Sequence, residues 1–141
     1  METFSVLLVD DEEEFLRTII KRLTKRGIEA VGATRGEQAL ELMAESPRDV
    51  VVLDVKMPGM DGLEVLKRIK DQWPNTEVIM LTGHASVEAA VEGMDGGAFD
   101  YLMKPADFED LLYKLEDAFR KKTLRDRGDR KQNENGTVGE N

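Results

Sequence analysis

The chain has 141 residues, no cysteine and a formal net charge of −9, which predicts one compact domain with a modest tail. The absence of cysteine excludes disulfides, thiolate metal sites and a cysteine nucleophile. The negative charge argues against direct nucleic-acid binding, which needs a basic surface. The apolar run at residues 4–9 is too short for a membrane span and lacks the flanks of a signal peptide. We therefore expect a cytoplasmic protein without membrane contact.

The apolar pattern alternates short strands and amphipathic helices five times along the chain. Continuous apolar runs are typical of strands buried on both faces of a parallel sheet. Strands separated by helices pair in parallel through right-handed crossovers. The sequence therefore predicts an α/β fold, a doubly wound (βα)5 sandwich of three layers around a five-stranded parallel sheet. The expected strands are 6–9, 28–31, 50–53, 78–81 and 98–102.

The helix starts are predicted from capping residues. Thr34 followed by Glu37 is a capping-box pattern, and Asp61 and Asp107 are expected N-caps of later helices. Ser86 is expected to open the short fourth helix. The first helix is predicted over residues 13–26 because Gly27 stops its apolar periodicity.

The apolar periodicity stops near residue 123, and Gly, Asn, Asp, Arg and Glu dominate the remainder. This composition predicts a domain at residues 1–122 and a polar, flexible tail at residues 123–141. The charge is also uneven, because residues 1–120 carry 14 basic and 25 acidic side chains, against 6 and 4 from Lys121 onward. An acidic body needs a cation to bind an anion readily.

Complementary polar groups follow four of the five predicted strands. Ligands of open parallel sheets bind at the carboxyl ends of the strands, near the point where the strand order reverses. Three like charges repel and stay ionised most easily beside a hard cation such as Mg²⁺. A hydroxyl and an ammonium group could hold phosphoryl oxygens. The groups in question are Asp10, Asp11, Asp54, Thr82 and Lys104.

Asp54 is the predicted nucleophile of this set, because it ends the most apolar strand and faces the other groups. An aspartate in such a place can accept a transferred phosphoryl group when a metal ion and donors neutralise the charge. Each residue also has an ordinary structural interpretation, as a turn former, a helix cap or a surface side chain. Asp61 is expected to cap a helix rather than bind metal. The joint arrangement favours phosphoryl chemistry.

With these residues in place, the chain resembles the receiver domain of bacterial two-component response regulators, the CheY-like family, over about residues 4–120. The resemblance implies a flavodoxin-like fold and a role in phosphorelay signal transduction. It rests on four motifs, which are Leu8-Val9-Asp10-Asp11, Leu53-Asp54-Val55-Lys56-Met57-Pro58-Gly59-Met60-Asp61-Gly62, Leu81-Thr82-Gly83-His84 and Tyr101-Leu102-Met103-Lys104-Pro105.

The resemblance implies a role for each acidic residue of the site. Asp54 would take a phosphoryl group from a phosphohistidine on a sensor histidine kinase or a phosphotransfer protein. Asp11, Asp54 and the backbone carbonyl of Lys56 would ligate Mg²⁺ directly, and Asp10 would act through water. Lys56 and the lone histidine, His84, would tune the lifetime of the phosphoryl group. For His84, a plain exposed side chain is the ordinary alternative.

The resemblance also implies a switch. Thr82 and Lys104 would contact the phosphoryl oxygens, and the peptide bond before Pro105 would be cis. Movement of Thr82 would let Tyr101 turn inward and change the surface formed by the fourth helix, fifth strand and fifth helix. An unknown downstream protein would recognise this surface, and an activation-dependent homodimer is plausible by analogy.

Rival interpretations stay open at this point. A pseudo-receiver would act by protein contact without accepting phosphate. A haloacid-dehalogenase-like phosphatase would need a second aspartate two residues after its nucleophile, where Lys56 stands. A nucleotide-binding domain would need a glycine-rich phosphate loop, and no such motif occurs. We expect no metabolic enzyme beyond self-phosphorylation and self-dephosphorylation, and either a stand-alone regulator or part of a longer one.

Overall fold

The computed structural model describes residues 3–83 and 87–139, with the side chains of residues 132–139 left undescribed. Its five strands form one parallel sheet in the order β2-β1-β3-β4-β5. Their apolar side chains fill the interior on both faces, which is why the runs are continuous rather than alternating. The predicted five-stranded parallel sheet is confirmed. The strands are β1 (Ser5–Val9), β2 (Glu29–Ala33), β3 (Val50–Leu53), β4 (Glu77–Thr82) and β5 (Asp100–Met103).

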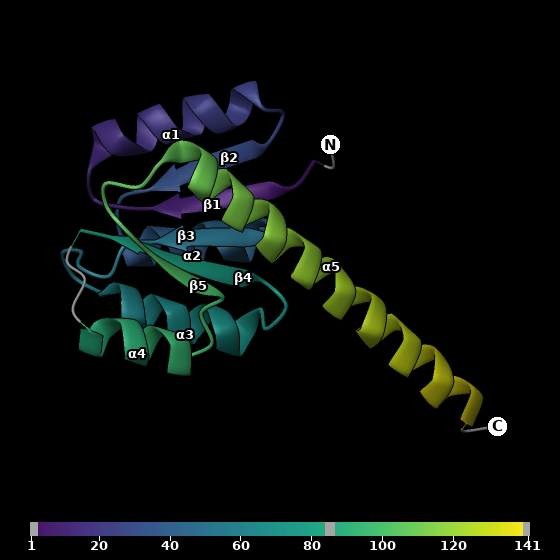
Figure 1. Ribbon diagram of the computed structural model, residues 1–141. Coiled ribbons are helices and arrows are strands. Elements are labelled where there is room, and N and C mark those ends of the chain that lie inside the picture. The colour runs from purple at the N-terminus through teal and green to yellow at the C-terminus, as the bar shows by residue number, and fades with distance from the viewer. Residues whose placement is uncertain (1–2, 84–86, 140–141) are drawn as a thin grey trace.

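Helices cover both faces of the sheet and complete the three layers (Figure 1). One hydrophobic core joins the sheet to α1 and α5, and the other joins it to α2, α3 and α4. This arrangement confirms the doubly wound α/β fold. No described helix combines the length and apolar character that crossing a bilayer requires. The helices are α1 (Glu13–Lys25), α2 (Gly36–Glu45), α3 (Gly62–Gln72), α4 (Val87–Asp95) and α5 (Phe108–Gly139).

Two of the predicted caps are confirmed and one is wrong. Asp61 accepts a hydrogen bond from the Glu64 amide at 3.0 Å, and Asp107 accepts one from the Glu109 amide at 2.8 Å. The capping box of Thr34 and Glu37 does not form, because α2 begins one residue later than expected. Arg35 is its N-cap, and the Thr34 amide donates instead to the Gln38 side chain at 3.0 Å. The predicted cap Ser86 lies outside the described residues.

The strand boundaries differ slightly from the sequence prediction. Strand β2 runs two residues further than expected, to Ala33, and β5 begins at Asp100 rather than at residue 98. Both differences follow from pairing, because Ala33 pairs with Val9 and Asp100 pairs with Ile79.

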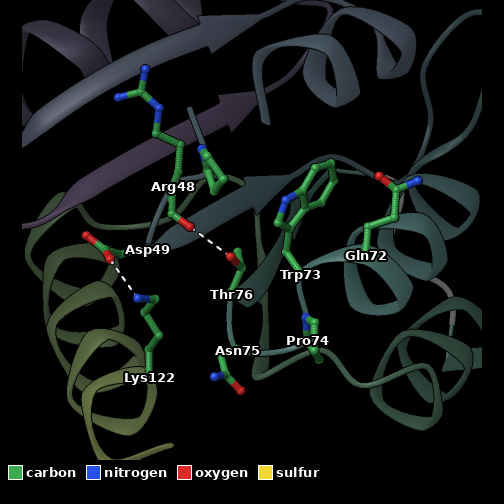
Figure 2. A pocket seen from close by; sticks show the side chains of 9 residues that line it. Arg48, Asp49, Gln72, Trp73, Pro74, Asn75, Thr76 and Lys122 are labelled. Carbon is green, nitrogen blue, oxygen red and sulfur yellow. Dashed lines mark hydrogen bonds and ion pairs between the residues drawn. The ribbon is translucent and has the colours of Figure 1, made fainter. Parts of the chain in front are cut away.

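Helix α5 continues well beyond the expected end of the domain at residue 122, and it projects past the sheet at the edge where the strands begin (Figure 1). The backbone of residues 123–139, where the composition predicts a polar, flexible tail, thus continues the helix. Lys122 pairs with Asp126 one turn later at 2.7 Å, and with Asp49 of the body at 3.1 Å (Figure 2). Such pairs support a helix that has little apolar periodicity. The flexibility of the tail as a separate segment stays a prediction.

Candidate functional site

The site lies at the carboxyl edge of the sheet, where the strand order reverses between β1 and β3. Backbone ladder bonds continue past both strands, from the Asp10 amide to the Ala33 carbonyl and from the Asp54 amide to the Val9 carbonyl, each at 3.0 Å. Asp10 and Asp54 are each only 3% exposed. The parallel pairing of apolar strands thus places two carboxyl groups inside the protein at this edge.

Asp10, Asp11 and Asp54 form a cluster whose carboxylate ligand atoms lie within 4.8 Å of one another. Asp11 is the exposed member of the cluster. The Asp54 Oδ1 atom is buried and has no hydrogen-bond partner among the described residues. Asp10 is different, because its Oδ1 accepts from the Glu12 amide at 2.9 Å and its Oδ2 accepts from Lys104 at 2.6 Å. Within the described residues, the cluster therefore contains a buried carboxylate oxygen, Asp54 Oδ1, that lacks a donor.

Lys104 enters the site from the end of β5, where its amide donates to the Thr82 carbonyl at 2.9 Å. Its Nζ atom contacts Asp10, lies 3.3 Å from Glu12 Oε1, and lies 4.3 Å from the centroid of the Phe15 ring. Burial alone would lower the pKa of Lys104, but the hydrogen bond to Asp10 and the surrounding carboxylate charges raise it instead. The side chain therefore remains a cation in this acidic edge.

Burial raises the pKa of Asp10, even though Lys104 and the Glu12 amide favour its charged form. In the described part of the chain, the acids Asp10, Asp11, Glu12 and Asp54 gather here, and the ion pairs bring one cation, Lys104, to them. This excess of negative charge is electrostatically costly, and an added cation would relieve it.

The loop between β3 and α3 covers Asp54 closely. A Cβ atom at Gly62 would lie 2.1 Å from the Asp54 carbonyl oxygen, and the Gly62 amide donates to the Val55 carbonyl at 2.7 Å. Gly59 has a φ of +78°, which glycine adopts without strain. The glycines of this motif therefore allow the loop to turn back onto the end of β3.

The other predicted residues occupy the same edge or its surroundings. Thr82 ends β4 and is fully buried, and the Lys104–Pro105 peptide bond is cis. The Tyr101 hydroxyl is buried without a hydrogen-bond partner among the described residues, and burial together with the charge of Asp54 raises the pKa of Tyr101. Lys56 has an exposed side chain. His84 lies outside the described residues.

Glu12 and Phe15 were not predicted as parts of the site. The acidic run after Asp11 gave a signal for Glu12, but it fits a helix start equally well. Phe15 packs against the core beneath α1, and its contact with Lys104 joins residues that are 89 positions apart in the chain. Sequence spacing alone cannot reveal such a contact.

A separate hollow of about 310 Å³ lies at the opposite edge of the sheet, where the strands begin (Figure 2). Its walls include Trp73, Asn75 and Lys122, and none of the predicted site residues lines it. The hollow is therefore distinct from the acidic cluster.

Comparison with known families gives a match over most of the chain. A sequence profile described as the response regulator receiver domain matches residues 6–116. The regulatory protein AtoC of Escherichia coli is 42% identical over 106 residues, which are 75% of this chain and 23% of that protein. The transcriptional regulatory protein KdpE of Mycobacterium tuberculosis is 38% identical over 118 residues, covering 84% of this chain and 52% of that protein. The chain thus spans about a quarter to a half of these relatives.

Solved structures show the same similarity in three dimensions. A response regulator receiver domain protein from Clostridium thermocellum has a TM-score of 0.81 and 36% identity, covering 86% of this chain and 98% of that one. The receiver domain of DrrB activated with BeF3 has a TM-score of 0.77 and 31% identity, covering 84% of this chain and 99% of that one.

Proposed function

The chain belongs to the response regulator receiver domain family of two-component phosphorelay signalling, and we propose that Asp54 is its phosphoryl acceptor in a Mg²⁺-dependent reaction. One observation carries this assignment. Among the residues that the structure describes, Asp54 Oδ1 is a buried carboxylate oxygen without a hydrogen-bond donor, and it lies in a cluster of three acids. A buried polar atom without a partner is costly unless something else binds it.

The residues present fit Mg²⁺ well. This ion prefers oxygen ligands and keeps several waters together with one or two carboxylates. Asp11 and Asp54 would ligate it directly, with the backbone carbonyl of Lys56 as a further ligand. Asp10 would act through water, because both of its oxygens already accept hydrogen bonds from the protein. The bound ion would neutralise charge on the transferred group.

In the proposed reaction, an Asp54 carboxylate oxygen attacks the phosphorus of a phosphohistidine on a histidine kinase or phosphotransfer protein. The bond between phosphorus and the donor nitrogen breaks, and the imidazole leaves with its electron pair. Lys104 and the Thr82 hydroxyl would hold the phosphoryl oxygens. Water later hydrolyses the acyl phosphate, and Lys56 and His84 would tune the rate of this step.

The output of the switch is proposed to be the surface formed by α4, β5 and α5. Exposed apolar side chains support this assignment, because such groups mark interaction surfaces when they gather together. Tyr101 lies on β5, which is part of this surface. Burial and the charge of Asp54 raise the pKa of its hydroxyl group. A downstream protein or a second copy of the chain would bind here. The exposed large apolar residues on these three elements are Val87, Val91, Met94, Met103, Tyr113 and Leu124.

The direct test is intact-mass spectrometry after incubation with acetyl phosphate and Mg²⁺. The wild-type protein should gain the mass of one phosphoryl group, and the gain should disappear in Asp54→Ala and after chelation of the metal. Asp61→Ala is the matched control, because Asp61 is an exposed acid of the same loop that caps α3, and it should still gain the group. Absence of any added mass in the wild type would favour a pseudo-receiver.

A further inference from the structure

The environment of the Lys104 ammonium group contains two residues that the proposed reaction does not use. Glu12 Oε1 lies 3.3 Å from Nζ, and the Phe15 ring centroid lies 4.3 Å from it. Glu12 is the N-cap of α1, and Phe15 lies in the first turn of that helix. No ion pair joins Lys104 to Asp54 among the described residues, because the ammonium group pairs with Asp10 and Glu12.

Burial decides which of these contacts matters more. The Lys104 side chain is only 13% exposed, whereas the Glu12 side chain is 63% exposed. Solvent and salt screen an exposed carboxylate, so Glu12 contributes little. A cation over an aromatic face gains more when water is excluded from it. The Phe15 contact should therefore be the stronger of the two.

We propose that Phe15 and, more weakly, Glu12 are positioning residues that hold the Lys104 ammonium group beside Asp10. A phosphoryl group on Asp54 competes for the same ammonium group, so these contacts oppose its transfer to the phosphoryl oxygens. This inference rests on the proposed function of Asp54. Through these two residues, the start of α1 would lower the stability of the phosphorylated form relative to the unphosphorylated one.

The first experiment observes the contact without any phosphoryl donor or metal. Protons on Lys104 Cε that lie over the Phe15 ring should resonate upfield in the NMR spectrum of the wild-type protein. The upfield shift should disappear in Phe15→Leu, which keeps apolar volume but removes the ring face. It should also decrease when beryllofluoride, a stable phosphoryl mimic, is added with Mg²⁺. Lys104 signals at their ordinary position in the wild type would overturn the inference.

The second experiment measures beryllofluoride affinity at saturating Mg²⁺. Phe15→Leu should bind about fivefold more tightly than the wild type, the effect of losing a partly desolvated cation–π contact. Glu12→Gln should bind about twofold more tightly at low salt, and the gain should vanish at high salt. Two control variants test for a general effect of charge or packing in α1. Glu14→Gln removes an equal charge from the helix, and Ile20→Val loosens its half-buried packing. Neither control should change the affinity for beryllofluoride.

The outcomes distinguish the two claims. Wild-type affinity in Phe15→Leu, or an equal change in Ile20→Val, would overturn the positioning role while leaving Asp54 as the acceptor. A wild-type protein that binds no beryllofluoride and gains no phosphoryl group would contradict the proposed function and this inference with it. In that case the upfield shift of Lys104 would still report whether the contact with Phe15 exists.

Discussion

Two buried carboxyl groups lie at opposite edges of the sheet, and the protein treats them differently. Asp54 follows β3 at the carboxyl edge, and Glu77 begins β4 at the amino edge. They are 3% and 0% exposed, and each has one carboxylate oxygen without a hydrogen-bond partner among the described residues. Neither burial nor an unpartnered carboxylate oxygen therefore distinguishes these two acids from each other.

The cations around them do distinguish them. Glu77 lies 2.5 Å from Arg125 Nη1, and the ammonium groups of Lys70 and Lys121 lie 3.9 Å from its oxygens. Two of these three cations come from α5, so the helix supplies the charge that the buried acid needs. Asp54 instead shares its edge with other acids, and Lys104, the cation that the described residues bring to this edge, pairs with Asp10. The amino edge is neutralised by the protein itself, whereas the carboxyl edge has negative charge available for a metal ion.

The two edges are also constructed differently. Gly62 of a tight loop packs against the backbone carbonyl of Asp54, whereas side chains of a long helix pair with the Glu77 carboxylate. Four substitutions, given in order of decreasing expected effect on the free energy of unfolding, test how each edge and the projecting part of α5 are stabilised.

The largest effect is expected for Gly62→Ala at the carboxyl edge. The new Cβ would lie 2.1 Å from the Asp54 carbonyl oxygen, and backbone cannot move aside as a flexible side chain can. The free energy of unfolding should fall by about 3 kcal/mol or more in urea denaturation. Gly83→Ala is the control, because among the described residues its Cβ would come no closer than 3.9 Å, to the Lys104 side chain. Equal stability of the two variants would contradict the close cover over Asp54.

The next effect is expected for Arg125→Ala at the amino edge. Breaking a buried ion pair by removing one partner usually costs more than about 3 kcal/mol. For this variant the free energy of unfolding should fall by about 2 kcal/mol, because the Arg125 side chain is itself 39% exposed and because Lys70 and Lys121 remain near Glu77. Arg127→Ala changes an exposed residue two positions further on and should cost at most about 0.5 kcal/mol. A similar loss in both variants would show that Glu77 does not depend on Arg125.

A smaller, stabilising effect is expected for Gly128→Ala in the projecting part of α5. Nothing lies within 4 Å of the added Cβ, and alanine favours a helix interior by about 1 kcal/mol over glycine. A rise of that size in the free energy of unfolding would show that this segment unfolds with the domain. No change would support the flexible tail that the composition predicts.

The smallest effect concerns Lys122 and depends on pH. Burial would lower the pKa of Lys122, but hydrogen bonds to Asp126 and Asp49 raise it above 10.5. The stabilisation is therefore fully present below pH 10.5 and is lost as the pH rises through the folded-state value. Lys122→Met should cost about 0.5 to 1 kcal/mol at neutral pH and nothing at pH values well above 10.5. An unchanged difference at both pH values would contradict the ion-pair account.

The sequence predicted the sheet and the carboxyl edge because both depend on local patterns. Continuous apolar runs locate buried strands, and the residue after each run must lie at the strand end, which places Asp10, Asp54 and Thr82 together. The roles expected for these three residues came from the resemblance of the motifs to the receiver family. The caps at Asp61 and Asp107 followed from similarly local rules, whereas α2 began one residue late because Gln38, rather than Glu37, faces back toward the helix start.

The amino edge could not be predicted in the same way. Glu77 precedes an apolar run and would ordinarily lie in solvent. In the fold it is buried and pairs with Arg125, which is 48 residues away on a helix with weak apolar periodicity. The spacing of Lys122 and Asp126 was the available signal that the helix continues, but such pairs alone stabilise a helix only slightly. Long-range ion pairs leave little trace in sequence patterns.

The difference between the two edges is tested most directly by titrating the wild-type protein with Mg²⁺ and following its backbone amide resonances. Shifts should centre on Asp10, Asp11, Asp54 and Lys56, and they should be absent around Asp49 and Glu77. Asp54→Asn should weaken binding strongly, because the variant removes one charged oxygen ligand from the cluster. Shifts centred on the amino edge, or no saturable shifts at all, would contradict the account of Asp54 as the acid that has a metal ion as its partner.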